Sequence, residues 1–132
     1  MNPHYPLVAR RAGHRCEYCH APEVAFNFAF EIEHVRPPAA GGTDHEANLA
    51  LGCRSCNLYK SDDTAGVDPL TGETVQLFHP RTDRWDEHFF VEPDSSILAT
   101  TAIGRATIDR LRMNSARQIF ARQKWRLLRL FP

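Results

Sequence analysis

Hydrophobic and polar positions alternate most regularly in residues 26–32, where four apolar side chains are separated by small or polar ones. This period of two predicts a half-buried β-strand that ends before Pro37-Pro38, because proline cannot continue a ladder. The apolar stretch 49–51 predicts a second strand, antiparallel to the first. A short helix fits residues 6–12, and residues 56–61 begin another.

The second half of the chain repeats this mixture of elements. Residues 62–74 are rich in turn-forming residues, and the segments 75–78 and 85–91 predict the two strands of a second hairpin. A helix is expected over 104–113, and a final amphipathic helix follows the capping residue Ser115. The pattern as a whole predicts an α+β fold.

Composition limits the classes of protein that fit this pattern. The chain has 132 residues, 42% hydrophobic and 24% charged, which is typical of a globular domain. We expect a single domain, 1–132, with a core motif over 10–62 and an extension over 63–132. No apolar run reaches the ~20 residues of a membrane span, and no signal peptide is visible. We therefore expect a cytoplasmic protein with reduced cysteines and no membrane partner.

The net charge of zero hides an uneven distribution. Residues 1–15 and 105–132 are basic, with eight basic residues and one acid in the second of these segments. Residues 16–104 are acidic. Basic ends on an acidic middle indicate either a surface that binds a polyanion or pairing within the molecule, and the arginine-rich final helices have the same two interpretations.

Four cysteines form two C-x2-C pairs, Cys16 with Cys19 and Cys53 with Cys56. Two such turns can present four thiolates to one tetrahedral ion, which predicts a structural Zn²⁺ site. His20 extends the first pair to the CxxCH pattern of haem attachment, but haem would leave the second pair unexplained. A thioredoxin-like redox role is disfavoured because no βαβ pattern surrounds either pair.

The stretch between the cysteine pairs carries a second set of motifs. They are Glu31-Ile32-Glu33-His34-Val35-Arg36-Pro37, then Gly41-Gly42-Thr43, then Asn48-Leu49, and finally Cys53-x2-Cys56-Asn57-x2-Lys60. In this order the chain resembles the HNH endonuclease family, over roughly residues 10–62. The resemblance implies a ββα-metal finger with two CxxC zinc knuckles, and metal-dependent hydrolysis of DNA phosphodiester bonds.

The same resemblance implies a role for each matching residue. His34 would be the general base that activates water, since a neutral imidazole suits that task near pH 7. Glu33 and Asn57 would hold the catalytic ion. Asn48 would brace the loop and the histidine, which completes the catalytic set of His34, Asn48 and Asn57. The alternatives are purely structural roles, with Glu33 and His34 at an ordinary strand end and Asn57 as a helix cap.

Two basic residues near these motifs are candidates for substrate contact. Lys60 lies one helical turn beyond Asn57, and Arg36 follows the histidine, so both are predicted to bind a phosphate. Lys60 could instead be an ordinary solvated helix residue. Two oxygen ligands leave room for water around the ion, which favours Mg²⁺ or Mn²⁺.

Two functions remain in competition. The first is an HNH endonuclease that acts on DNA, expected to be double-stranded and bound with low sequence specificity. One active site makes nicking the default outcome. The alternative is a non-catalytic, zinc-stabilised module of the same fold that binds nucleic acid or protein.

Overall fold

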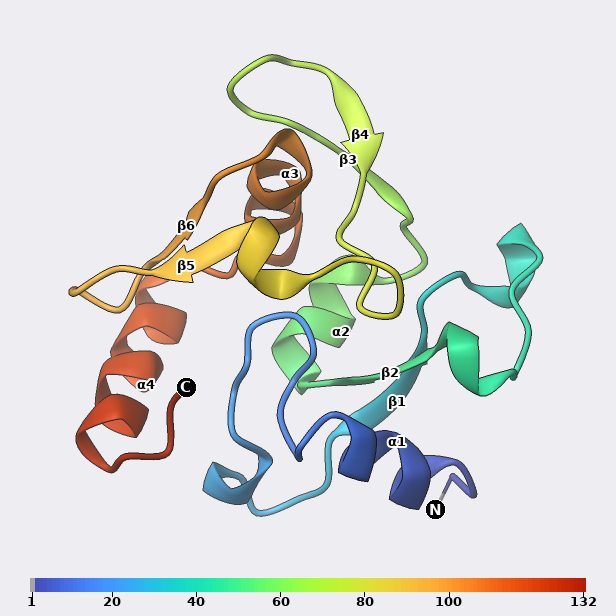
Figure 1. Ribbon diagram of the computed structural model, residues 1–132, viewed down its shortest axis with the longest axis horizontal. Coiled ribbons are helices and arrows are strands. Elements are labelled where there is room, and N and C mark those ends of the chain that lie inside the picture. The colour runs from blue at the N-terminus through green and yellow to red at the C-terminus, as the bar shows by residue number, and fades with distance from the viewer. Residues whose placement is uncertain (1) are drawn as a thin grey trace.

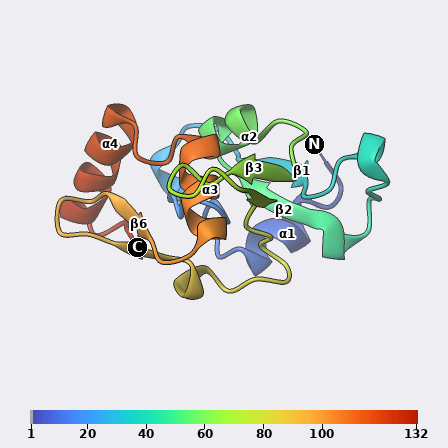
Figure 2. The ribbon, with the colours of Figure 1, turned by 90° about the horizontal axis from the view of Figure 1, so that it is seen from above.

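The computed structural model describes residues 2–132, and its elements confirm the α+β class (Figure 1). Within that range the helices are α1 (Tyr5–Arg11), α2 (Arg54–Lys60), α3 (Ala102–Leu111) and α4 (Ala116–Leu127). The strands are β1 (Glu31–His34), β2 (Leu49–Gly52), β3 (Ala65–Val67), β4 (Thr74–Gln76), β5 (Phe89–Val91) and β6 (Ile97–Ala99). They pair as three antiparallel hairpins. Seen from above, the molecule has α4 at one end and the loop between β1 and β2 at the other (Figure 2).

The first hairpin and the helix after it form the predicted ββα unit. His34 pairs with Leu49 and Glu31 pairs with Gly52, so all four residues of each strand are used. Every residue of β2 is buried, which explains its unbroken apolar sequence. Cys53 follows at once and caps α2, because its sulfur accepts a hydrogen bond from the Cys56 amide at 3.4 Å.

The prediction of a strand over 26–32 was wrong in its boundaries, because the strand covers only Glu31–His34. β2 ends at Gly52, which pairs with Glu31, and the chain then turns into α2. The residues before Glu31 therefore have no partner strand. Their aromatic side chains pack on one another instead: the Phe26 ring lies 4.9 Å from that of Phe30 and 5.9 Å from that of Trp125.

The predicted pairing of 75–78 with 85–91 was also wrong. β4 pairs with β3, and β5 pairs with β6. The reason is turn chemistry: Gly72 has a φ of 77° and donates its amide to the Asp68 carbonyl at 2.8 Å, which closes the β3–β4 hairpin. At the β5–β6 turn, the Asp94 carboxylate accepts from the Ser96 amide at 2.9 Å.

The C-terminal helices follow their predicted signals. Ser115 caps α4 by accepting from the Gln118 amide, and Thr101 caps α3 in the same way. α3 begins two residues earlier than expected because its cap is Thr101, and it ends in a left-handed residue, Arg112.

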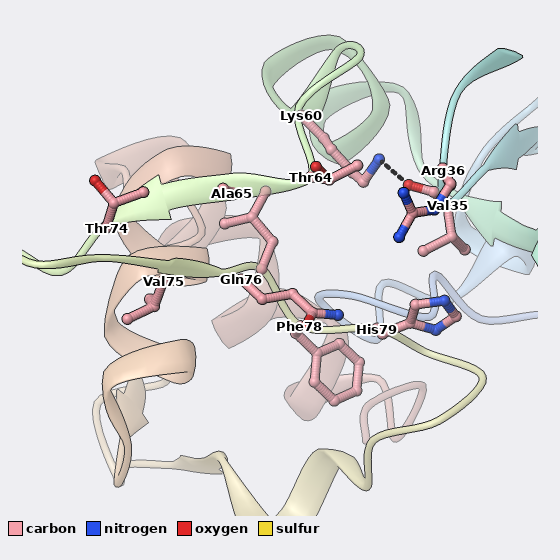
Figure 3. Close-up of a pocket in the computed structure, with 11 residues that line it drawn as sticks. Val35, Arg36, Lys60, Thr64, Ala65, Thr74, Val75, Gln76, Phe78 and His79 are labelled. Carbon is pink, nitrogen blue, oxygen red and sulfur yellow. Dashed lines mark hydrogen bonds between the residues drawn. The ribbon is translucent and has the colours of Figure 1, made fainter. Parts of the chain in front are cut away.

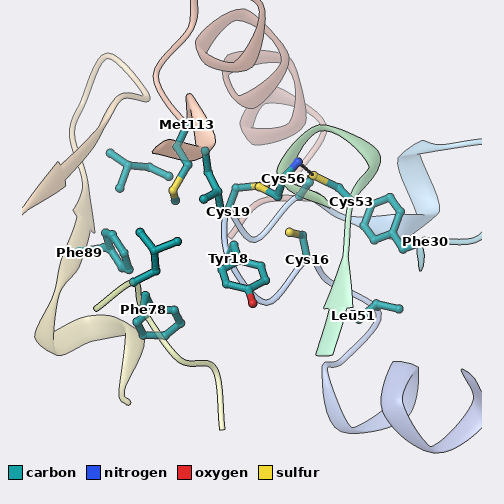
Figure 4. Packing of buried hydrophobic residues seen from close by; sticks show 14 of the residues in the cluster. Cys16, Tyr18, Cys19, Phe30, Leu51, Cys53, Cys56, Phe78, Phe89 and Met113 are labelled. Atoms are coloured by element: carbon teal, nitrogen blue, oxygen red, sulfur yellow. Dashed lines mark hydrogen bonds between the residues drawn. The ribbon is translucent and has the colours of Figure 1, made fainter. Parts of the chain in front are cut away.

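One buried cluster joins the ββα unit to the extension (Figure 4). Tyr18 lies between the cysteine thiols and the edge of the Phe78 ring, at 6.4 Å between ring centroids. The Trp85 indole donates to the Tyr18 carbonyl at 2.7 Å, and Arg15 donates to the Leu130 carbonyl at 2.8 Å. The extension therefore packs directly on the cysteine turns.

Several basic residues of the C-terminal segment have partners inside the molecule. Arg122 is fully buried and donates to the carbonyls of Ser95 and Met113. Arg105 pairs with Asp68, and Arg110 pairs with Asp63. Pairing within the molecule thus accounts for these three arginines, while Arg117, Lys124 and Arg129 remain exposed.

The Asp68–Arg105 pair predicts a pH dependence of stability. Arg105 donates to both Asp68 oxygens, at 2.9 and 2.8 Å, and these bonds hold the pKa of Asp68 well below its usual range. A lowered folded-state pKa contributes stability that is present above about pH 4 and is lost as pH falls through the folded value. We expect Asp68→Asn to destabilise the protein at pH 7, and less so at pH 3, by urea unfolding. Glu73→Gln, an exposed acid in the same turn, is the control. A loss in Asp68→Asn that is equal at both pH values would contradict this account.

Candidate functional site

The four cysteine thiols meet between the turn at 16–19 and the start of α2. Their sulfur atoms all lie within 4.8 Å of one another, and the side chains are buried and free of disulfides. The Cys19 and Cys53 sulfurs are 3.7 Å apart, which matches the edge of a tetrahedron with Zn–S bonds of about 2.3 Å. The cluster therefore fits one structural zinc ion, as the sequence predicted.

The local backbone explains how the first knuckle closes. The His20 amide donates to the Cys16 carbonyl at 2.9 Å, and His20 has a φ of 65°. The His20 ring stacks on Trp85 with centroids 4.0 Å apart, and burial lowers the pKa of His20 to about 4. His20 is thus neutral, and its ring packs where the extension meets the first C-x2-C turn.

Glu33 directs its carboxylate into the protein, with only 5% of the residue exposed. One oxygen accepts from the Tyr18 hydroxyl, and the other lies 3.4 Å from the Lys60 ammonium. Burial raises the pKa of Glu33, against the opposing effects of Lys60 and Tyr18. The predicted metal ligand therefore has protein partners for both of its oxygens.

Glu33, His34 and Asn57 nevertheless line one cavity of about 200 Å³. It lies between the end of β1, the Pro37-Pro38 turn and the C-terminal end of α2. Gly52 lies beside two of these side chains, since a Cβ there would be in ordinary contact with both Glu33 and Asn57, at 3.8 Å. The structure thus brings together three of the residues that the motifs singled out.

Asn57 also contacts an acid to which the sequence gave no role. Its side-chain nitrogen donates to the exposed Glu31 carboxylate. The side-chain carbonyl oxygen of Asn57 takes no part in this bond. Glu31 and Glu33 are two residues apart on β1, so they occupy the same face of the strand. This two-residue spacing was the sequence signal that could have placed Glu31 beside the predicted site.

His34 has a partner in the loop that follows β1. Its Nε2 lies 2.7 Å from the Asp44 carboxylate, and hydrogen bonding to His34 lowers the pKa of Asp44. With Asp44 ionised, Nε2–H donates and Nδ1 is left to accept a proton. The spacing of residues along the sequence gave no signal for this contact, because nothing local links residues ten apart.

Asn48 fastens this loop to the end of β1. Its carbonyl accepts from the Arg36 amide at 2.9 Å, and its amide nitrogen donates to the carbonyls of Arg36 and Thr43 at 2.9 and 2.8 Å. Thr43 precedes Asp44, and Arg36 lies two residues after His34. Asn48 therefore holds the two segments that carry the histidine and its carboxylate.

Gly42 is packed against this clamp so closely that no side chain fits. A Cβ would lie 1.7 Å from the Arg36 carbonyl oxygen, which is backbone and cannot rotate away. We expect Gly42→Ala to destabilise the protein by about 2 kcal/mol and to disturb the His34–Asp44 contact. Gly52→Ala is the matched control, because a Cβ there would make only ordinary contacts, at 3.8 Å, and the backbone is not left-handed. Urea unfolding checks the order, and an equal loss in both variants would contradict the packing argument.

The two predicted phosphate contacts occupy different surroundings. Lys60 is 1% exposed and donates to the Val35 carbonyl at 3.0 Å in addition to its ion pair with Glu33. Its ammonium thus lies inside the protein rather than on a helix surface. Arg36 is exposed at the edge of the Asn48 clamp.

Comparison with protein families agrees with these motifs. A family model described as HNH endonuclease matches residues 16–63. Searches of curated proteins and of solved structures gave no significant match. Over the described residues, no helix combines the length and the apolar character needed to cross a bilayer. The matched segment contains both cysteine pairs, Glu33, His34, Asn48 and Asn57, and residues 16–63 are therefore similar to the HNH endonuclease family.

Proposed function

We propose that this protein is a metal-dependent endonuclease that hydrolyses DNA phosphodiester bonds. The observation that supports it is the cavity shared by Glu33, His34 and Asn57, with His34 held by Asp44 at 2.7 Å. Zinc binding alone requires none of these four residues. Such a constellation of base, orienting carboxylate and oxygen donors suits the hydrolysis of a phosphodiester.

In this proposal His34 is the general base. Asp44 orients the imidazole and stabilises its charge after protonation, so Nδ1 takes the proton of the attacking water. Asn48 keeps the Asp44 loop in register with β1 through its bonds to Thr43 and Arg36. The exposed guanidinium of Arg36 is placed to meet a neighbouring phosphate.

The donors at the cavity fit a hard divalent cation, Mg²⁺ or Mn²⁺. Asn57 would hold it through its carbonyl oxygen and Glu33 through its carboxylate, with Glu31 beside them. Such an ion, when bound, stabilises the extra charge on the phosphate and assists the leaving oxygen. Lys60 balances the Glu33 charge inside the protein, and we assign it this positioning role.

The DNA contact in this proposal is electrostatic and tolerant of sequence. Arg117, Lys124 and Arg129 are exposed on and after α4, and basic side chains of this kind bind the phosphate backbone without reading bases. We expect the DNA to be double-stranded, and one active site makes a single nick per encounter the default outcome. A cytoplasmic setting suits the reduced cysteine cluster.

A supercoiled-plasmid assay tests the proposal. The protein is loaded with one equivalent of zinc and incubated with plasmid, with and without added Mg²⁺ or Mn²⁺. We expect nicked circles only in the presence of the added ion. Omission of that ion is a better control than EDTA, because EDTA also removes the structural zinc.

One observation favours the alternative of a non-catalytic zinc-stabilised binding module. Both oxygens of Glu33 already have protein partners, Tyr18 and Lys60. Such a module would shift DNA or a protein partner equally with and without Mg²⁺ and would leave the plasmid supercoiled. That pair of results would overturn the nuclease proposal.

A further inference from the structure

A second cavity, of about 320 Å³, lies between the end of β1 and the β3–β4 hairpin (Figure 3). Its apolar wall includes Val35, Val75, Leu77 and Phe78. The side chains of Arg36, Gln76 and His79 converge on its open side. A hollow that combines an apolar wall with a few converging polar groups can hold a small ligand that has both kinds of surface.

Two of the three polar side chains at this cavity make no side-chain hydrogen bond to the described part of the protein. Over residues 2–132, neither the Arg36 guanidinium nor the Gln76 amide has a hydrogen bond to another residue. Two hydrogen bonds hold His79 in place. Its Nδ1 accepts from the Arg81 amide at 3.1 Å, and its own backbone amide donates to the Asp83 carboxylate at 2.9 Å. Its neutral ring therefore carries the proton on Nε2 as a donor.

The electrostatics of the cavity are positive at one end. Burial lowers the pKa of His79, and the positive charges of Arg36 and Lys60 lower it further. Both of these cationic side chains, Arg36 and Lys60, line the cavity. Lys60 is partnered by Glu33, so Arg36 is the basic group left at the rim for a phosphate.

This cavity adjoins the proposed active site through a shared wall. Lys60 lines it and also contacts Glu33, which lines the first cavity. Arg36 lies two residues beyond His34, in the bend that follows the end of β1. A nucleotide whose phosphate lies near His34 can therefore place an adjoining base at the second cavity.

We propose that this cavity is a subsite for one nucleobase turned out of the DNA stack beside the scissile phosphate. The proposal rests on the endonuclease function and extends it to the 63–132 segment. A base offers two apolar faces to Val35 and Phe78, and a polar edge to Gln76 and His79. Enzymes that take bases out of the duplex read them by hydrogen bonds to the base edge and by contacts with apolar side chains.

A fluorescent duplex tests the subsite directly. A short DNA duplex carries one 2-aminopurine, whose emission is quenched by stacking and rises when the base leaves the stack. The zinc-loaded protein is added without Mg²⁺, so that no cleavage occurs, and anisotropy of an end label measures binding separately. We expect binding to be accompanied by a rise in 2-aminopurine emission.

Matched variants assign the signal to the cavity. Gln76→Ala and His79→Ala are expected to reduce the emission rise about tenfold, while duplex binding by anisotropy stays near the wild-type level. Gln123→Ala and His14→Ala make the same chemical changes at exposed positions outside the cavity and keep the full rise. Gln76 is exposed, so its replacement leaves the fold and the zinc content intact.

The results separate the two proposals when read beside the plasmid assay. A rise that both cavity variants retain overturns the subsite, as does a wild-type protein that nicks plasmid but gives no rise. A rise that the variants lose, in a protein that never nicks, keeps the subsite and removes the nuclease. A protein that neither binds the duplex nor nicks plasmid overturns both.

Discussion

His34→Ala is expected to slow metal-dependent nicking by at least about 100-fold, which is the lower end of the contribution of a general base. The imidazole lines the cavity, and Asp44 holds its Nε2 at 2.7 Å, which leaves Nδ1 to accept a proton. Alanine leaves the water without a base, and it replaces a side chain that is only partly covered, with 32% of its surface exposed. Initial rates of conversion of supercoiled to nicked plasmid measure the effect.

Two further variants complete this test. His14→Ala removes a histidine whose contact is Glu23, away from the cavity, and is expected to nick at the wild-type rate. Asp44→Asn keeps a hydrogen-bond acceptor for Nε2 but removes its charge, so we expect an intermediate rate. Zinc content and unfolding should be unchanged in all three. Full nicking by His34→Ala would remove the histidine from the mechanism.

Cys53→Ser is expected to abolish stoichiometric zinc binding and cooperative unfolding. Structural zinc contributes roughly 10–16 kcal/mol in small zinc domains, which is as large as the whole stability of a typical domain, about 5–15 kcal/mol. The thiols also form part of the buried cluster that includes Tyr18 and Met113. Bound zinc per chain and the urea transition are the measurements.

Ser55→Ala is the matched control for this second prediction. It lies in the same turn between Cys53 and Cys56 and is not among the clustered thiols. We expect one zinc per chain and a normal transition from this variant. A Cys53→Ser protein that keeps both its zinc and its cooperative transition would show that the cluster is not a structural metal site.

Much of this fold is encoded locally, which is why the sequence predicted it. The apolar run of β2, the CxxC spacing and the Ser115 cap each act over a few residues, and the structure contains all three. The motif spacing likewise predicted residues that share the first cavity, because a hairpin followed by a helix brings the end of β1 beside Asn57.

The errors have the opposite origin. Whether residues 26–30 pair as a strand depends on where β2 ends, and the alternating aromatics give no information on that point. The burial of Glu33 against Tyr18 and Lys60 joins three separate segments of chain. The Asp44 contact with His34 depends on the path of a loop. Such long-range geometry is not readable from spacing along one sequence.

The bond between Arg15 and the Leu130 carbonyl joins residues 115 apart in sequence. The four thiols, by contrast, all lie within the first 56 residues. During synthesis the ribosome therefore releases all four thiols before it makes the segment that carries Leu130. The ligand set is complete before the C-terminal contact that packs beside the first C-x2-C turn can form.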